Sequence, residues 1–146
     1  MKKLKLTWLD GILVLFAILF IYAAFSKLIT FDEFKAQIGK SPLITSQVWW
    51  ISWFVPSIEI VVALCLFVPR FQLLALYASF SLMFAFTGYI FIILNFSPYV
   101  PCSCGGILSS MGWEEHLIFN IGFTLLAVVG IFLYNRQKRK TEITAA

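Results

Sequence analysis

Two cysteines separated by one residue form the most reactive group in this sequence. Cys102, Ser103 and Cys104 stand between Pro101 and the Gly105-Gly106 pair. In an extended strand the two thiols would point to opposite faces, so a bond between them needs a turn, and the flanking proline and glycines suit one. A disulfide in so short a turn is strained, and strained exposed disulfides exchange readily with other thiols. The spacing therefore predicts thiol-disulfide redox chemistry at Cys102 and Cys104.

Two other functions would use the same cysteines. A structural disulfide would only staple a loop of a non-catalytic membrane scaffold. Alternatively, Cys102 and Cys104, together with Met111 or His116, would supply soft ligands for Cu(I) in a metal-handling protein. Redox exchange is our first interpretation, and in that interpretation no residue is assigned as a metal ligand.

The elements that must position this pair are membrane helices. Of the 146 residues, 61% are hydrophobic and 12% are charged, and the mean hydropathy is +0.93. An ordinary soluble domain has about 25% charged residues. A spanning helix needs roughly 20 mostly apolar residues, so we expect a single all-α membrane domain over residues 1–146. The uncharged stretches predict a bundle of four transmembrane helices, near 10–29, 48–68, 71–95 and 115–135.

The basic residues predict how this bundle is oriented. With four crossings, eight of the 11 Lys and Arg residues share one side: Lys2, Lys3, Lys5, Arg70, Arg136, Lys138, Arg139 and Lys140. The positive-inside rule makes that side cytoplasmic, so both termini lie inside and the cysteine loop, 96–114, lies outside. Disulfides persist outside a bacterial inner membrane but not in the cytosol. A secretory signal peptide is the alternative for the first span, and its cleavage would leave the same loop outside.

Three more polar residues are candidates for a proton relay or for polar support. Glu59 is the only acidic residue deep in a predicted span, so it should face the bundle interior and be paired, hydrogen-bonded or protonated. It would serve as a proton acceptor or as a polar anchor for a head group, or it would make a structural contact with residues such as Thr87 or Tyr89. His116 and Asn120 lie four residues apart, hence on one face of the fourth helix, which follows the cysteine loop. His116 is able to carry a thiol proton. Each of the three also has a purely structural interpretation, as a polar contact or an interfacial side chain.

The connections and the ends of the spans carry weaker signals. Phe31, Phe34 and Ile38 recur at helical spacing and predict a short interfacial helix that would act as a lid beside the cysteine loop. Pro69-Arg70 predicts a tight hairpin between the second and third spans. Cys65 lies a full bilayer away from the other cysteines, so we expect it to serve packing. The basic C-terminal run indicates contact with membrane lipid and no nucleic-acid partner.

Four features of the chain occur together in one order: Ala24-Phe-Ser-Lys27-Leu28, Pro56-Ser-Ile-Glu59, Pro101-Cys-Ser-Cys-Gly and Asn120. In these features, and from about Gly11 to Tyr134, the chain resembles the MauE branch of the DoxX-like membrane proteins. The resemblance implies a four-helix membrane bundle associated with extracytoplasmic thioredoxin-like proteins and with disulfide formation in the methylamine dehydrogenase light chain. Gly105, where a Phe is frequent, and Phe119, where an Arg is common, depart from the pattern. These departures leave the redox interpretation intact and weaken the link to methylamine utilisation itself.

We therefore expect a multi-pass protein of the bacterial inner (cytoplasmic) membrane. It would pass electrons from an extracytoplasmic thioredoxin-like partner through Cys102 and Cys104, and any enzymatic activity would be that of a thiol-disulfide oxidoreductase. Analogy with other membrane proteins that oxidise thiols suggests a quinone as the next acceptor. The five Trp residues do not themselves require one, because tryptophan is also typical of interfacial belts.

Overall fold

The computed structural model describes residues 7–40, 45–97 and 112–145, and the regular structure in these ranges is helical. Four of the described helices are long and apolar enough to cross a membrane: α1 (Trp8–Ile29), α3 (Val48–Phe67), α4 (Gln72–Phe96) and α5 (Trp113–Ala145). Between α1 and α3 lie the short helix α2 (Phe31–Lys40) and a 3₁₀ turn, η1 (Thr45–Gln47). The prediction of an all-α fold with four long apolar helices is confirmed.

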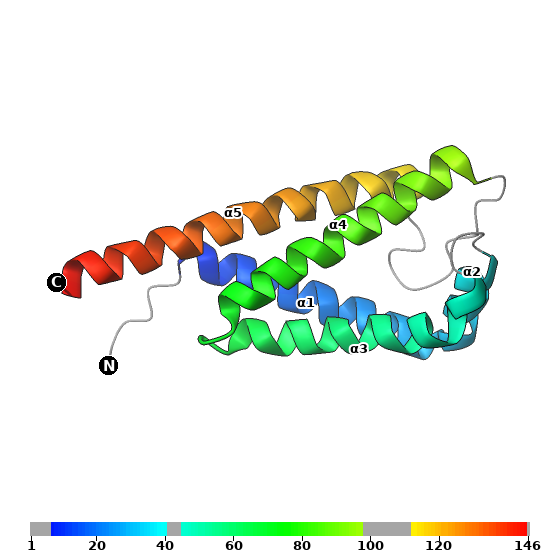
Figure 1. The fold of residues 1–146 in the computed structure, drawn as a ribbon, viewed down its shortest axis with the longest axis horizontal. Coiled ribbons are helices and arrows are strands. Elements are labelled where there is room, and N and C mark those ends of the chain that lie inside the picture. Colours follow the sequence, from blue (N-terminus) through cyan, green and yellow to red (C-terminus); the bar gives the residue numbers. More distant parts are fainter. Residues whose placement is uncertain (1–6, 41–44, 98–111, 146) are drawn as a thin grey trace.

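The four long helices form two antiparallel pairs (Figure 1). α1 packs mainly against α3, and α4 packs mainly against α5. Contacts between α3 and α4, and between α1 and α5, join one pair to the other. The pairs lie close together near the α3–α4 turn and diverge toward the end that carries α2 (Figure 1). The bundle is therefore closed at one end and open at the other.

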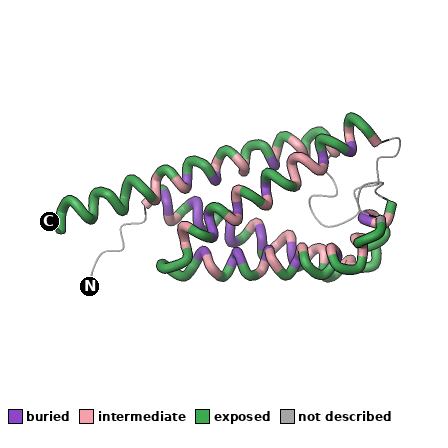
Figure 2. The backbone as a smooth tube through the Cα atoms, in the orientation of Figure 1, coloured by how far each residue is buried: buried purple, intermediate pink, exposed green. Residues whose placement is uncertain are grey.

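A hydrophobic core fills the closed half of the bundle (Figure 2). Phe16 and Leu76 are 0% exposed, and the Phe16 ring meets Phe123 of α5 edge to face, with centroids 5.5 Å apart. At Gly130 of α5, an added Cβ would lie 3.1 Å from Leu76 Cδ2 and 3.2 Å from Ile12 Cγ2. The missing side chain of Gly130 thus lets α5 approach α4 and α1 together.

The observed ends of α1 and α5 differ from the predicted ones for physical reasons. α1 begins at Trp8 because a capping box precedes the apolar run: the Thr7 N–H donates to Asp10 Oδ2 at 2.8 Å, and the Asp10 N–H donates to Thr7 Oγ1 at 3.3 Å. α5 continues past the predicted end at 135 as far as Ala145. Its basic run marks the end of the apolar segment, but Arg, Lys and Gln are good helix formers, so the helix persists.

Two predicted connections are confirmed. The turn from α3 to α4 contains Pro69 and is closed by a hydrogen bond from the Phe71 N–H to the Val68 carbonyl oxygen, 2.9 Å. The predicted short helix is α2, which packs against the start of α3. There the Phe31 ring lies 4.8 Å from the Trp53 ring, centroid to centroid. α2 is thereby held at the end of the α1–α3 pair, at the open end of the bundle.

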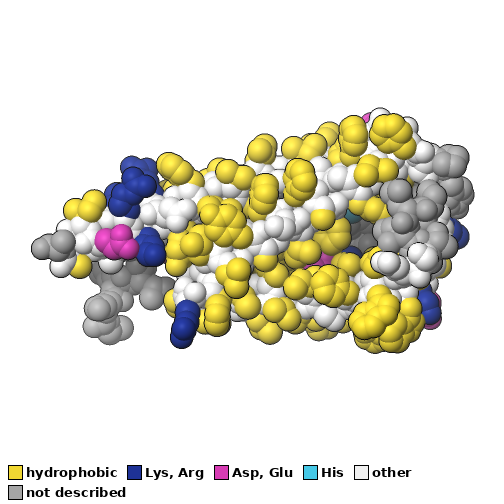
Figure 3. All heavy atoms as spheres, viewed as in Figure 1, with side chains coloured by type: hydrophobic (Ala, Val, Ile, Leu, Met, Phe, Trp, Pro, Cys, Tyr) yellow, Lys and Arg dark blue, Asp and Glu magenta, His cyan; other side chains and the backbone are white. Residues whose placement is uncertain are grey.

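The outer surface of the bundle is mostly hydrophobic (Figure 3). Large side chains such as Ile18, Phe54 and Leu125 are 60%, 61% and 63% exposed, as expected for helices that face lipid. Basic side chains gather toward the two ends of the molecule (Figure 3). The described structure thus has the surface of a multi-pass membrane protein, and the side that faces the cytoplasm remains a prediction.

Candidate functional site

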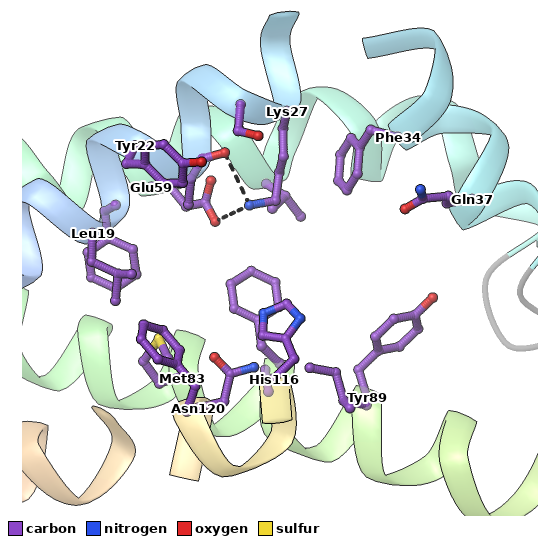
Figure 4. A pocket seen from close by; sticks show the side chains of 18 of the residues that line it. Leu19, Tyr22, Lys27, Phe34, Gln37, Glu59, Met83, Tyr89, His116 and Asn120 are labelled. Atoms are coloured by element: carbon purple, nitrogen blue, oxygen red, sulfur yellow. Dashed lines mark hydrogen bonds and ion pairs between the residues drawn. The ribbon is translucent and has the colours of Figure 1, made fainter. Parts of the chain in front are cut away.

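The candidate site is built around an ion pair between α1 and α3. Lys27 Nζ lies 2.8 Å from Glu59 Oε1 and 3.4 Å from the backbone carbonyl oxygen of Ala23 (Figure 4). The Glu59 side chain is 1% exposed and that of Lys27 is 21% exposed. A carboxylate inside a membrane bundle requires such a partner.

The directions of the helices explain why these side chains meet. Helical side chains tilt toward the N-terminus of their own helix. Lys27 stands near the end of α1 and therefore leans back into the bundle, whereas Glu59, on the antiparallel α3, leans toward the α2 end. At a rise of about 1.5 Å per residue, Glu59 lies about 17 Å along α3 from its start. Glu59 is therefore near the middle of α3, a helix of 20 residues whose length matches a hydrocarbon core of about 30 Å.

Aromatic rings from two other helices surround the ammonium group. Lys27 Nζ lies 5.9 Å from the ring centroid of Phe34, on α2, and 5.5 Å from that of Phe86, on α4. Both distances are within the range of cation–π attraction. Lys27 thus makes contacts with α2, α3 and α4, and it holds the open end of the bundle together.

α5 contributes the predicted pair His116 and Asn120 from one helix face. Asn120 is 4% exposed and His116 is half-buried. The His116 ring lies 6.5 Å from the Trp113 ring, centroid to centroid. Figure 4 shows His116 and Asn120 on one side of a cavity, with the Lys27–Glu59 pair on the other.

This cavity has a volume of about 390 Å³ and lies between the diverging helix pairs. All five α-helices line it, and Figure 3 shows the surface hollowed there, with acidic and imidazole side chains inside the hollow. Its size is within the range of about 300–1,000 Å³ that is usual for small-molecule sites. Most of its walls are apolar, among them Phe20, Phe34, Val55, Met83, Phe86 and Phe119.

Two buried polar atoms at the cavity have no hydrogen-bond partner within the described part of the chain, namely Glu59 Oε2 and Asn120 Nδ2. The first is an acceptor and the second is a donor. An unpaired buried polar group costs about 1–3 kcal/mol. The site is therefore suited to a mostly apolar molecule with one end that both accepts and donates hydrogen bonds.

The amino-acid sequence that forms these helices matches a known protein family. The model of the family described as methylamine utilisation protein MauE covers residues 3–133 of the chain. The chain belongs to the MauE family. The resemblance predicted from the sequence is confirmed, and the matched range contains every residue that lines the cavity. No curated protein and no solved structure matches this MauE-family chain.

Three of the five predicted site residues of this MauE-family protein come together at the cavity: Glu59, His116 and Asn120. The other two, Cys102 and Cys104, lie outside the described residues, so their redox role stays a prediction. Sequence reasoning missed Lys27 as the partner of Glu59. The sequence did contain a signal, because Lys27 belongs to one of the motifs that carry the family resemblance. Since Lys27 stands near the end of the first predicted span, it was interpreted only as a basic residue that flanks the membrane.

Glu59 is buried, paired and hydrogen-bonded, as predicted, but with a different residue from the two named as examples. The Thr87 hydroxyl donates to the Met83 carbonyl oxygen at 2.7 Å and lies 3.4 Å from the Thr124 hydroxyl oxygen. Tyr89 lines the cavity, but the hydrogen bond to Glu59 comes from Lys27. Of the predicted alternatives for Glu59, the structure thus has the ion pair.

Two further predictions concern metal and the third cysteine. Within residues 7–40, 45–97 and 112–145, no three His, Cys, Asp or Glu side chains are grouped to hold a metal ion. Of the suggested Cu(I) ligands only His116 is among these residues, so that alternative is not tested. Cys65 is a free thiol packed against the hydrophobic core in the closed half of the bundle, which agrees with a packing role.

Proposed function

We propose that this MauE-family protein is a thiol-disulfide redox protein of the bacterial inner membrane. In this proposal Cys102 and Cys104 exchange electrons with an extracytoplasmic thioredoxin-like partner. One observation carries the proposal: the cavity beside Glu59 and Asn120 is also lined by Trp113 and His116, which follow closely after the segment that bears both cysteines. The reactive pair thus stands shortly before the part of α5 that forms one wall of the cavity.

The arrangement of the helix ends supports this pairing. α4 ends and α5 begins at the end of the bundle that carries α2 and the cavity (Figure 1). Thiol exchange needs a thiolate and therefore a group that accepts its proton. His116, whose neutral imidazole is able to accept a proton, stands in the first turns of α5.

The charges at the two ends support an extracytoplasmic position for the cavity. Arg70 lies in the α3–α4 turn and Arg136 begins the basic run of α5, both away from α2 (Figure 1). α2 carries two basic residues, Lys35 and Lys40. The positive-inside rule then assigns the α2 end to the outside, where protein disulfides persist.

The exchange balances without any further reactant. A thiolate of the partner attacks one sulfur of the Cys102–Cys104 disulfide, and the other cysteine leaves as a thiolate while a mixed disulfide forms. The second thiolate of the partner then attacks its own sulfur in the mixed disulfide and releases the remaining cysteine. The partner ends as a disulfide, and Cys102 and Cys104 gain two electrons.

Trapping the mixed disulfide tests the proposal. Cys104→Ser should accumulate a covalent adduct between Cys102 and a periplasmic protein, because the Cys102 thiolate still attacks the disulfide of an oxidised partner, whereas Cys104 is no longer present to resolve the mixed disulfide. Non-reducing electrophoresis and mass spectrometry of isolated membranes would detect the adduct, and a reducing agent would dissolve it. Cys65→Ser, which removes a thiol in the packed core, is the matched control and should give no adduct. If neither Cys102→Ser nor Cys104→Ser gives an adduct and the wild-type pair stays oxidised in mild reductant, the disulfide is a structural staple.

A further inference from the structure

We propose that the cavity between the two helix pairs binds a membrane quinone and its quinol, held by Asn120 and the Lys27–Glu59 pair. The ligand would accept the electrons that Cys102 and Cys104 collect. Its role as an acceptor rests on the proposed thiol exchange, whereas its binding does not. The residues that would bind it all belong to the described part of the chain.

The buried polar side chains divide into two kinds. The Ser52 and Ser79 hydroxyls donate to carbonyl oxygens one turn earlier in their own helices, at 2.6 and 2.7 Å. Glu59 and Asn120 are equally buried, at 1% and 4% exposed, yet each keeps an atom without a partner among the described residues. Both unpaired atoms belong to residues of the cavity wall. Unsatisfied polar atoms thus coincide with the cavity, which is the pattern expected of a site completed by a ligand.

The charge of the site favours a neutral ligand. Lys27 and Glu59 neutralise each other across 2.8 Å. A phosphate or carboxylate head would gain from the ammonium but would meet the Glu59 carboxylate. Conversely, a saturated acyl chain has no atom for Glu59 Oε2 or Asn120 Nδ2 and would leave both unpaired. These two exclusions leave a neutral molecule with polar oxygens on an apolar body.

The walls and the surroundings of the cavity favour a lipid-soluble ring. Phe34, Phe86 and Phe119 line the cavity, and aromatic rings stack favourably on one another. The hollow lies on a face of the molecule covered with hydrophobic side chains (Figure 3). A ligand dissolved in the membrane would therefore meet the cavity without crossing the aqueous phase.

A quinone head uses both polar walls. Its carbonyl oxygens accept hydrogen bonds, which Asn120 Nδ2 is placed to donate; the hydroxyls of the quinol donate, which Glu59 Oε2 is placed to accept (Figure 4). The overall step also balances. Oxidation of two thiols to one disulfide releases two electrons and two protons, and reduction of a quinone to a quinol takes up the same number, with two new O–H bonds.

Binding measurements on a redox-inactive protein test this inference. The Cys102→Ser/Cys104→Ser protein would be purified in mild detergent, and binding of decylubiquinone and of decylubiquinol would be measured separately by equilibrium dialysis. We expect saturable binding of both forms. Asn120→Leu, nearly the same shape without the amide, should weaken binding of both forms about tenfold, the effect of one lost hydrogen bond. Glu59→Gln should weaken quinol binding about tenfold and spare the quinone, because an N–H₂ group replaces an acceptor.

The controls separate binding from folding. Asn95→Leu makes the same change at an exposed asparagine of α4 that bonds to its own helix, and it should leave both affinities unchanged. Asn120→Leu should not lower the thermal unfolding midpoint, because it removes a donor that lacks a partner in the described structure.

Three outcomes would overturn the quinone site: no saturable binding, equal affinities in the Asn120→Leu and parent proteins, or displacement of the probe by a phospholipid at equal concentration. Because the tested protein lacks both loop cysteines, none of these outcomes depends on thiol exchange. Binding as expected, combined with no trapped adduct in the cysteine variants, would instead refute the proposed function and keep the quinone site.

Discussion

Replacing Lys27 by methionine removes the ammonium that neutralises Glu59, whose side chain is 1% exposed. Removing one partner of a buried ion pair typically costs about 3–5 kcal/mol, because the other charge is left uncompensated. Glu59→Leu should cost less, about 1–3 kcal/mol, since Lys27 is 21% exposed and stands near the end of α1, where its long side chain is able to turn toward the interface. The double substitution Lys27→Met/Glu59→Leu should fall within about 1 kcal/mol of the wild type, because neither charge remains.

A double-mutant cycle measures this coupling directly. The free energy of unfolding would be obtained for the wild type, the two single variants and the double variant from reversible unfolding in mixed detergent micelles, followed by circular dichroism at 222 nm. The matched control is Lys35→Met with Glu33→Leu, a change of one lysine and one glutamate that are both exposed on α2. Exposed substitutions of this kind usually change stability by less than about 0.5 kcal/mol. If the two single effects at Lys27 and Glu59 simply add, the ion pair does not stabilise the bundle and the reasoning fails.

Two other predictions address packing and orientation. Gly130→Val should lower the free energy of unfolding by about 1–3 kcal/mol, because its Cβ would press on Leu76 and Ile12. Gly122→Val is the control and should have little effect, because a Cβ added there meets nothing within 4 Å. Similar losses of stability at both positions would contradict the close helix contact at Gly130. A membrane-impermeant thiol reagent applied to reduced intact spheroplasts should label Cys102 and Cys104 but not Cys65, and labelling of the loop cysteines only after lysis would reverse the orientation.

The spans were predictable because a membrane imposes one dominant condition on the chain. Backbone groups in lipid must bond within their own helix, so an uncharged stretch of sufficient length is nearly always a helix. The same signal places the ends less well, since it reports where apolar residues stop and not where hydrogen bonding stops. Hence the capping box at Thr7 and Asp10 moved the start of α1, and α5 extended through its charged run to Ala145.

The ion pair was not predictable from the same signal. Hydropathy separates Lys27 from the apolar part of α1, but the position of its charge depends on where a long side chain points. The tilt of the side chain toward the N-terminus of α1 carries the ammonium back into the bundle, where the antiparallel α3 presents Glu59. Only the pairing of α1 with α3 brings these residues together, and that pairing is a tertiary property.

The polar residues near the cavity show which hydrogen bonds can be predicted from a single helix and which cannot. A buried serine in a helix bonds to the carbonyl oxygen one turn earlier, as Ser52 and Ser79 do, and this solution is available in any helix. Glu59 and Asn120 have longer side chains with two polar atoms each, so their needs must be met by other helices or by a ligand. In the described structure the divergence of the two helix pairs leaves space beside both residues. In the sequence of a membrane protein, the informative residues are therefore polar ones whose hydrogen bonds cannot be made within a single helix. They mark the places where the bundle contacts another helix or receives a ligand.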